Sequence, residues 1–469
     1  MIPTYNPFGA SVRAADIMMA SSASRDAIHA RQRQRLRELV GFARAASPFY
    51  RSLYRGLADE VDDVAALPVV TKAALMDHFG DVVTDRRITR RAVEEFAARK
   101  DRIGHLLNGR YALWKSSGTT GDPALFLHDR DALATYDMLF FVRGWSPAAT
   151  PAQMLGFWGQ GGRMACVTAN EDHYAGIASW RRMAISYPML RSLVRDYSVL
   201  EPLDTLVARL NEWRPAQLVG YPSILALLAH EQIEGRLNIS PSLVIVGGEC
   251  FDDDEHDLIG KAFGALVRAV YACAECDYIA FECAHRWLHV NADWIILEPV
   301  DKSLKPVPAG TPSHTCLLTN LANRVQPIIR YEIPDSATVR PDPCPCGSPL
   351  PAIRVEGRRN QALRLPTASG ETVAILPMAI TTVLELIPGL RRFQIDRTGL
   401  TTLLVRCEFE AGADKKNIGS TILGRLREFL TSKDLGGVEV ALSEGGFKSA
   451  GAGGKFQQVM SSYDAERAG

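Results

Sequence analysis

The strongest chemical signal in the sequence is a short run of glycines and hydroxyl-bearing residues. It consists of Ser116, Ser117, Gly118, Thr119, Thr120, Gly121, Asp122 and Pro123. Glycines let backbone N–H groups approach an anion closely, and serine and threonine hydroxyls add donors, so such a run can wrap the β- and γ-phosphates of a nucleotide. No Gly-Lys-Ser/Thr stands at the spacing of a Walker motif, and no GxGxxG of a dinucleotide site is present around Gly159. The run predicts a nucleotide-phosphate loop of another type, with a surface turn as the alternative.

Three cysteines and one histidine form a second candidate site. They are Cys283, His289, Cys344 and Cys346. The two cysteines of the CPCG segment lie on a loop rich in proline and glycine, which packing alone would not hold in one conformation. Thiolates and imidazoles are the usual ligands of closed tetrahedral zinc sites. The pattern predicts a structural zinc, with buried free thiols, or His285 in place of His289, as alternatives.

The elements that must position these residues alternate between short apolar runs and longer helical patterns. Between about residues 105 and 300, runs such as LVIVGG and WIILEPV alternate with helical segments such as SILALLAHEQIEG. This alternation predicts α/β architecture with an at least partly parallel sheet. Nearer the N-terminus, apolar residues at helical spacing from Leu36 to Ala43 predict an amphipathic helix that ends near Pro48.

A change in composition near residues 357–361 predicts a domain boundary. VEGRRNQ follows a stretch rich in proline and cysteine there, and beyond it TTLLVRCEFE and GGVEVALSE look like strands on either side of the helix NIGSTILGRLREFL. The expected organisation is a large N-terminal α/β domain of residues 1–357 and a small C-terminal α+β domain of residues 358–469.

The segment SSGTTGDP resembles the phosphate loop of the adenylate-forming superfamily, which includes the acyl-CoA synthetases. Further segments, two before this loop and the others after it, resemble the phenylacetate-CoA ligase branch of this superfamily and occur in the same order. They are SPFYRSLY, LPVVTK, LVGYPSILALLA, VIVGGE, YACAE, LLTNLANRVQPIIRYEIPD, CPCG, VEGR and GGKF. The resemblance covers nearly the whole chain. It implies a large adenylate-forming domain with mixed and parallel sheets, a small mobile C-terminal domain, and the use of ATP, Mg²⁺ and coenzyme A.

The resemblance assigns binding roles within the large domain. Its positions for the ATP phosphates are Ser116, Ser117, Gly118, Thr119, Thr120 and Gly121. Gly247, Gly248 and Glu249 would pass beside the adenine and the acyl group, where glycine leaves room. Tyr271 would stack near the adenine. Asp335 would accept hydrogen bonds from both ribose hydroxyls.

Catalytic roles fall on three further residues. Glu275 would bind magnesium through a hard carboxylate oxygen, and Arg358 would approach the ribose and phosphates at the hinge between the domains. Lys455, on the glycine loop GAGGKF, would stabilise charge while the substrate carboxylate attacks the α-phosphate.

The sequence departs from the family pattern beside two of these residues. Ala272 and Ala274 stand where the family usually has a glycine and a small hydroxyl residue, and an Ile-Pro pair precedes Asp335 where threonine and glycine are common. The two alanines leave the magnesium role of Glu275 standing and leave open the local hydrogen bonding around it.

The implied reaction converts a carboxylic acid and ATP into an acyl-adenylate and transfers the acyl group to coenzyme A, with release of AMP and pyrophosphate. An aromatic acid is expected, and Phe157, Trp158 and Tyr221 are candidates for lining an apolar pocket. Other acceptors stay open, namely a carrier-protein thiol supplied in trans, an amine or a small nucleophile. A zinc-stabilised binding protein with a decayed nucleotide site is the alternative from another class.

Composition limits the partners. The 53 basic and 53 acidic residues cancel, which gives no reason to expect nucleic acid or an anionic membrane as the main partner. No segment approaches the roughly 18 apolar residues of a membrane span, and the N-terminus has no apolar stretch of signal-peptide length. A cytoplasmic protein that binds a small-molecule acid is expected, and a homodimer stays open.

Overall fold

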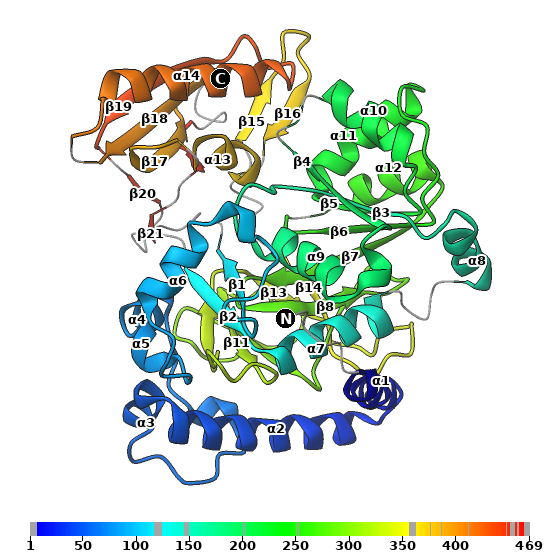
Figure 1. Cartoon of the computed structure of the whole chain (residues 1–469), viewed down its shortest axis with the longest axis vertical. Helices are drawn as coiled ribbons and strands as arrows, with labels where there is room; N and C mark the ends of the chain where they lie inside the picture. Colours follow the sequence, from blue (N-terminus) through cyan, green and yellow to red (C-terminus); the bar gives the residue numbers. More distant parts are fainter. Residues whose placement is uncertain are drawn as a thin grey trace. The chain divides into compact units, whose positions relative to one another are not determined.

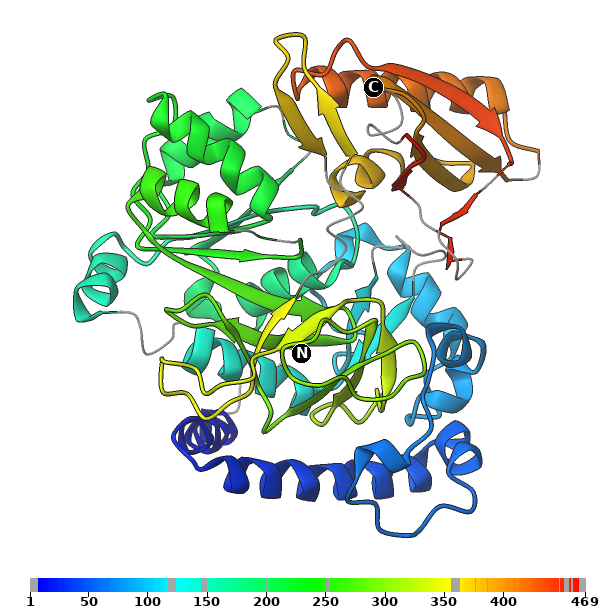
Figure 2. The same ribbon diagram turned by 180° about the vertical axis from the view of Figure 1, so that it is seen from behind.

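The computed structural model divides into two compact units (Figures 1 and 2). It describes residues 7–116, 124–144, 150–199, 201, 203–249, 251, 253–355, 363–375, 377–385, 387–410, 412–446, 448–450, 455–456 and 459–463. The second unit contains the described residues of two ranges, 198–209 and 358–469. All other described residues belong to the first unit. The predicted boundary between residues 357 and 358, and the roles expected of the two domains, stay predictions.

The α-helices lie mostly in the first unit. They are α1 (Pro7–Ser21), α2 (Arg25–Ala46), α3 (Pro48–Leu53), α4 (Lys72–Asp77), α5 (Phe79–Val82), α6 (Arg90–Ala97), α7 (Arg130–Leu139), α8 (Pro151–Gly159), α9 (Ala175–Ser186), α10 (Leu203–Trp213), α11 (Pro222–Ile233), α12 (Asp253–Phe263), α13 (Pro377–Glu385) and α14 (Lys415–Thr431).

The strands of the first unit run from β1 to β14. They are β1 (Ala112–Lys115), β2 (Leu125–His128), β3 (Met164–Thr168), β4 (Val194–Ser198), β5 (Gln217–Gly220), β6 (Leu243–Gly247), β7 (Leu266–Cys273), β8 (Cys276–Glu282), β9 (Leu288–Val290), β10 (Ile295–Val300), β11 (Thr315–Asn320), β12 (Tyr331–Ile333), β13 (Ala337–Val339) and β14 (Ala352–Val355).

A nine-stranded mixed sheet is the centre of the first unit, in the order β13-β14-β9-β8-β7-β6-β5-β3-β4. Strands β3, β5, β6 and β7 are parallel neighbours, and helices stand between them in the chain because a parallel pair needs a long crossover. From β7 to β13 the neighbours are antiparallel. The antiparallel sheet β10-β11-β12 and the hairpin β1-β2 complete the strands of this unit. The predicted α/β class with a partly parallel sheet is confirmed.

Helix α2 follows its sequence pattern closely. Ser24 caps its first turn, because the Ser24 side chain accepts a hydrogen bond from the backbone N–H of Ala27. The apolar positions of one face, Ile28, Leu36, Leu39, Val40 and Ala43, are buried. The helix ends at Ala46, just before Pro48 starts α3, as predicted. Within the described ranges, no helix combines the length and the apolar character needed to cross a membrane.

The second unit contains a small α+β arrangement. Its strands are β15 (Leu363–Pro366), β16 (Thr372–Ile375), β17 (Leu390–Arg397), β18 (Thr402–Phe409), β19 (Glu439–Glu444), β20 (Ser449–Ala450), β21 (Lys455–Phe456) and β22 (Val459–Ser461). Its main sheet has the order β19-β18-β17-β22, and α14 buries Ile418, Ile422, Leu426 and Leu430 in the core beside the strand residues Leu403 and Val405. The strands and helix predicted from TTLLVRCEFE, GGVEVALSE and NIGSTILGRLREFL are therefore present as β18, β19 and α14.

Candidate active site

The predicted binding residues gather where the parallel strands of the large sheet end. β6 ends at Gly247 and leads into Gly248 and Glu249, and β7 ends at Cys273, just before Glu275. Because β6 and β7 are paired in parallel, their carboxyl ends lie at the same edge of the sheet. Ligands of open α/β sheets bind at this edge, so it is the candidate active site.

The two glycines after β6 have structural reasons to be glycine. A Cβ at Gly247 would lie 2.8 Å from Val270 Cγ2 and 3.2 Å from the Val270 carbonyl oxygen, so the close packing of β6 against β7 leaves no room for a side chain. Gly248 has φ +83°, a left-handed conformation that side chains rarely adopt. These two demands account for both glycines, and their place beside adenine and the acyl group stays a prediction.

Two residues with predicted nucleotide-binding roles are hydrogen-bonded to each other. The Tyr271 hydroxyl donates to Asp335 Oδ2 over 2.8 Å. Burial raises the pKa of Tyr271, and the neighbouring charge of Asp335 acts in the same direction, so the phenol stays protonated and remains a donor. The structure thus brings together residues 64 positions apart in the chain, and their roles toward adenine and ribose stay predictions.

Glu275 forms the two-residue turn between β7 and β8 together with Ala274. Burial raises the pKa of its carboxyl group and the nearby Asp335 adds to the effect, while hydrogen bonds from Cys273 and Tyr331 oppose it. A raised pKa means that this half-buried carboxylate is less stable in its charged form than a solvated one, and a bound cation would stabilise it. Mg²⁺ is commonly bound through one or two carboxylates together with substrate phosphates, so the donor chemistry of Glu275 fits the predicted magnesium site.

Most of the predicted phosphate loop lies outside the described residues. Ser117, Gly118, Thr119, Thr120 and Gly121 belong to this part. The two flanking residues, Ser116 and Ala124, are joined by two hydrogen bonds: Ser116 N–H donates to the Ala124 carbonyl over 2.9 Å, and Ala124 N–H donates to Ser116 Oγ over 2.8 Å. The ends of the loop are therefore held together at the hairpin of β1 and β2.

Two catalytic residues were expected outside the large sheet, one at the hinge and one in the small domain, and the structure describes only the second of them. Arg358 lies outside the described residues. Lys455 is described by its backbone, which pairs with Ala450 in the short ladder of β20 and β21. Their roles in the reaction stay predictions.

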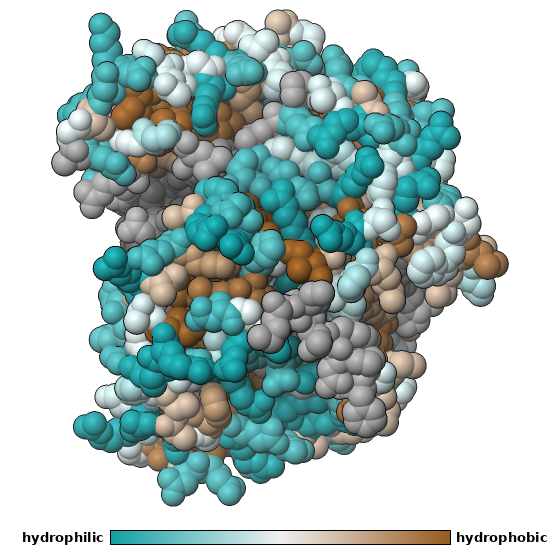
Figure 3. Space-filling view, in the orientation of Figure 1, coloured by the Kyte–Doolittle hydropathy of each residue, from teal (hydrophilic) through white to brown (hydrophobic). Residues whose placement is uncertain are grey.

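Two of the three aromatic residues proposed for an acyl pocket are placed elsewhere, which corrects the prediction. Phe157 and Trp158 lie on α8, which approaches the amino end of β6: a Cβ at Gly156 would lie 2.9 Å from Ser242 Oγ, one residue before that strand. This is the opposite end of β6 from the candidate site. Trp158 is 64% exposed. Figure 3 shows hydrophobic residues, coloured brown, on the surface in the region of α8.

Tyr221, the third aromatic candidate, does follow the carboxyl end of a parallel strand. It comes directly after β5, and its hydroxyl accepts a hydrogen bond over 2.8 Å from Thr168, the last residue of β3. Tyr221 therefore remains a candidate for the acyl pocket. The sequence around Phe157 and Trp158 did not show that their helix, α8, lies near the other edge of the sheet.

The four predicted zinc ligands come together as a cluster. Their ligand atoms, from Cys283, His289, Cys344 and Cys346, all lie within 4.8 Å of one another. The Sγ atoms of Cys283 and Cys344 are 3.7 Å apart, and Cys346 Sγ is 3.2 Å from His289 Nε2. Zinc–sulfur bonds of about 2.3 Å at a tetrahedral angle place two sulfur atoms about 3.8 Å apart. The described geometry therefore fits a four-coordinate zinc ion.

The surroundings of the cluster also suit a metal. His289 Nδ1 lies 2.9 Å from the Leu350 carbonyl, which requires the proton on Nδ1 and leaves the Nε2 lone pair directed at the cysteines. His285 contributes its backbone N–H to Cys283 Sγ over 3.4 Å, so His289 is the histidine of the cluster. Burial opposes ionisation of Cys283, but its contacts with His289 and Cys344 and hydrogen bonds from the backbone of His285 and Trp287 outweigh it and lower the thiol pKa to about 6. A thiolate is the form that binds metal.

The cluster lies at the end of β8 opposite to the candidate active site. β8 begins directly after Glu275 and ends directly before Cys283, and its 7 residues at about 3.3 Å each place about 20 Å between these two ends. A closed four-ligand site at this distance has no open position for a substrate. The geometry therefore suits a structural ion.

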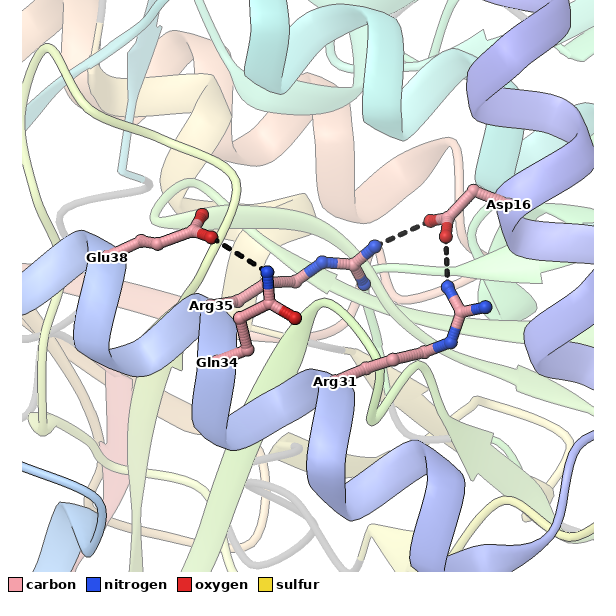
Figure 4. Close-up of a pocket in the computed structure, with 5 residues that line it drawn as sticks. All are labelled: Asp16, Arg31, Gln34, Arg35 and Glu38. Carbon is pink, nitrogen blue, oxygen red and sulfur yellow. Dashed lines mark hydrogen bonds and ion pairs between the residues drawn. The ribbon is translucent and has the colours of Figure 1, made fainter.

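A polar hollow between α1 and α2 has a structural explanation (Figure 4). It is lined by Asp16, Arg31, Gln34, Arg35 and Glu38. Asp16 forms ion pairs with both Arg31 and Arg35, the second over 2.5 Å, and Gln34 donates to Glu38. Because Asp16 engages both guanidinium groups, these contacts join the two helices and give no reason to propose a ligand there.

Three buried side chains beside the Glu275 turn escaped the sequence analysis. His128, Tyr136 and Asn320 belong to β2, α7 and β11, and each has at most 1% of its surface exposed. Asn320 lies inside the segment LLTNL that carries the family resemblance, but nothing in its local pattern shows that its side chain reaches the turn.

No protein-family model matches the sequence. Among curated proteins, a phenylacetate-coenzyme A ligase of Thermus thermophilus is 21% identical over 342 residues, which are 69% of this chain and 68% of that protein. Protein CapK of Staphylococcus aureus is 23% identical over 224 residues, which are 46% of this chain and 47% of that protein.

Solved structures of a 2-hydroxyisobutyryl-CoA ligase match nearly the whole chain. The form in complex with 2-HIB-AMP and CoA in the thioesterification state is 24% identical with a TM-score of 0.55, covering 94% of this chain and 90% of that one. The form with 2-HIB-AMP in the postadenylation state is 23% identical with a TM-score of 0.53, covering 96% and 93%. The fold is thus that of an adenylate-forming enzyme, and the predicted resemblance to the phenylacetate-CoA ligase-like branch is confirmed.

Proposed function

We propose that this chain, a relative of the phenylacetate-CoA ligase branch of the adenylate-forming superfamily, activates a carboxylic acid with ATP and transfers the acyl group to coenzyme A. The observation that carries the proposal is the position of Glu275, Tyr271 and Asp335. The sequence resemblance assigns these residues to the family's magnesium and nucleotide positions. Tyr271 and Glu275 lie at the carboxyl end of β7, and Asp335, which follows β12, is hydrogen-bonded to Tyr271. The similarity to acid–CoA ligases supports the reaction class.

In the proposed first step, the substrate carboxylate attacks the ATP α-phosphate and pyrophosphate leaves. Asp335 and Tyr271 hold the nucleoside. Glu275 would hold a magnesium ion, which would supply positive charge against the phosphates. Lys455 approaches the reacting oxygens and stabilises the charge that develops on them. In the second step Lys455 moves away with the small domain about residues 358–360. The thiol of coenzyme A then loses its proton and attacks the acyl carbon, and the bond from this carbon to the phosphate oxygen breaks to release AMP.

An aromatic acid is the proposed substrate class, supported by the sequence similarity to a phenylacetate-coenzyme A ligase. Coenzyme A is the proposed acceptor, since one of the similar structures reported above is a CoA ligase in complex with 2-HIB-AMP and CoA. An amine, a small nucleophile or a carrier-protein thiol is the alternative acceptor, and a homodimer remains an open proposal.

Pyrophosphate exchange tests the first step without assuming an acceptor. We expect the purified protein to exchange labelled pyrophosphate into ATP in the presence of Mg²⁺ and one of a panel of acids. The panel contains benzoate, phenylacetate and hydroxylated aryl acids, together with short branched hydroxy acids as the contrasting class. Exchange with aryl acids alone supports the substrate class, and exchange with hydroxy acids alone contradicts it. A zinc-stabilised binding protein with a decayed nucleotide site would exchange with none of them.

We further propose that the cluster of Cys283, His289, Cys344 and Cys346 binds a structural zinc ion. Metal analysis of the purified protein is expected to find about one zinc per chain. Cys344→Ser should lower the metal content and lower the thermal midpoint by about 5 °C or more, on the scale of 2 to 4 °C per kcal/mol for large domains, with acid specificity unchanged.

The matched control for the zinc prediction is Cys316→Ser, which alters a fully buried cysteine outside the cluster. The control variant should keep one zinc per chain. A parent protein that is free of metal and yet fully stable would contradict the proposal.

A further inference from the structure

A buried hydrogen-bond network contacts the turn that carries Glu275. Asn320 Nδ2 donates to the Tyr136 hydroxyl over 2.6 Å and to the Glu275 carbonyl oxygen over 3.1 Å. His128 Nδ1 lies 3.2 Å from the same Tyr136 hydroxyl, and His128 Nε2 lies 3.0 Å from the Ala274 carbonyl oxygen. Two successive carbonyl groups of the turn are therefore held by side chains from other elements.

The direction of each hydrogen bond follows from the donors and acceptors. The Ala274 carbonyl can only accept, so His128 Nε2 carries the proton. Burial lowers the pKa of His128 to about 3, so the ring is neutral near pH 7 and its Nδ1 is an acceptor. Tyr136, whose oxygen accepts from Asn320, can then donate its proton to His128 Nδ1, although the Cys276 thiol also contacts this hydroxyl.

The remaining groups of the network are satisfied and packed. Asn320 Oδ1 accepts from Ala322 N–H over 3.1 Å, and the Trp114 ring packs on His128 with centroids 3.8 Å apart. With both amide protons and the amide oxygen engaged, Asn320 has one orientation that satisfies its hydrogen bonds. A fully satisfied buried network of this kind rigidifies the groups that it contacts.

The two held carbonyls belong to the peptide groups on either side of the Glu275 Cα. Peptide groups are planar, so fixing both of them fixes φ and ψ of the residue between them. The direction of the Cα–Cβ bond of Glu275 is then fixed as well. The turn has only two residues, and its one alanine, Ala274, offers no side-chain hydrogen bond of its own. The hydrogen bonds that hold the turn therefore come from side chains of other elements.

We infer that His128 and Asn320, coupled through Tyr136, are positioning residues that aim the Glu275 carboxylate at the magnesium ion during adenylation. The inference rests on the proposed function, in which Glu275 is the magnesium ligand. It predicts that disturbing the network changes the use of magnesium in the first step more than it changes the second step.

The first test compares variants of His128. His128→Leu removes the donor to Ala274, and His128→Gln keeps an amide N–H near the position of Nε2. We expect His128→Leu to slow pyrophosphate exchange by about 10- to 100-fold, less than the roughly 10²- to 10³-fold of losing a group that itself contacts the reacting atoms, and to raise the magnesium concentration for half-maximal exchange. His128→Gln should restore both values to within a few-fold of the parent. Thioester formation from a supplied acyl-adenylate should stay within a few-fold of the parent in both variants.

The matched control is Tyr50→Phe, which removes a fully buried hydroxyl that donates over 2.8 Å to the Pro327 carbonyl, away from the turn. This variant should lose stability without a change in magnesium dependence. If His128→Leu slowed both steps equally and left the magnesium dependence unchanged, the inference would be wrong.

A second measurement does not need the reaction at all. Hydrogen–deuterium exchange of peptides that cover residues 271–278 should become faster in Asn320→Ala than in the parent and in Tyr50→Phe. Unchanged exchange in this segment would overturn the positioning role even if the enzyme were active. Faster exchange in a protein that adenylates no acid would support the network and would count against the proposed function instead.

Discussion

Replacing Lys455 with alanine is expected to slow adenylation by about 10²- to 10³-fold, the scale of removing one preorganised electrostatic group. The ammonium group is proposed to act only while the carboxylate attacks the α-phosphate, because two negatively charged groups must then approach each other. Thiolysis of a chemically prepared acyl-adenylate should stay within a few-fold of the parent rate. The measurement compares both half-reactions in the same preparation of the variant.

A lysine of the same unit serves as the control. Lys415 is exposed and forms a surface ion pair with Glu444, a contact of the kind that contributes little to stability. Lys415→Ala should leave both half-reactions unchanged. Equal losses in both half-reactions of Lys455→Ala would mean that the lysine supports folding or a fixed site, and the proposed movement of the small domain would have to be abandoned.

Asp335→Ala is expected to weaken ATP binding by about 1.5 to 3 kcal/mol, or about 10- to 150-fold in Kd. The variant removes the charged acceptor proposed for both ribose hydroxyls. It also leaves the Tyr271 hydroxyl without the partner that it has at 2.8 Å. Asp335→Asn should have a smaller effect, because the amide oxygen can still accept. Calorimetric titration with ATP and Mg²⁺ measures these differences.

Tyr271→Phe separates the two consequences of losing Asp335. It removes the hydroxyl and keeps the carboxylate, so ATP binding should fall by only a few-fold. If Tyr271→Phe weakened binding as much as Asp335→Ala, the role of Asp335 would be to hold the tyrosine. If Asp335→Ala bound ATP as the parent does, the ribose assignment would be wrong.

Local patterns were sufficient to predict the elements whose stability is mainly local or depends on one buried face. The buried face of α2 from Leu36 to Ala43 and the apolar strand β6 are examples. The cysteine and histidine cluster was also predictable, because these residue types have few other reasons to occur on a proline-rich loop. Its four ligands do come together, and the choice of His289 over His285 needed the structure.

The contacts that the sequence could not predict join distant parts of the chain. His128 and Ala274 are 146 positions apart, and no local signal records that β2 and the turn before β8 meet. Trp158 shows the opposite error: an aromatic residue suggested a binding pocket, but its helix precedes β3 and approaches the amino end of β6. Which edge of a sheet a residue occupies depends on strand order, and strand order is set by packing across the whole unit.

The proposed zinc site of cysteines and histidine would also affect the unfolded chain. Cys283 and Cys344 are 61 positions apart, and the segment between them carries both Asn320 and Asp335. A bound ion that joins these cysteines closes this segment into a loop. In the chain-entropy model, closing a loop of this length lowers the conformational entropy of the unfolded state, which raises its free energy by about 4 kcal/mol at 25 °C. Zinc would therefore reduce the random search through which the segment carrying these two residues must find the sheet.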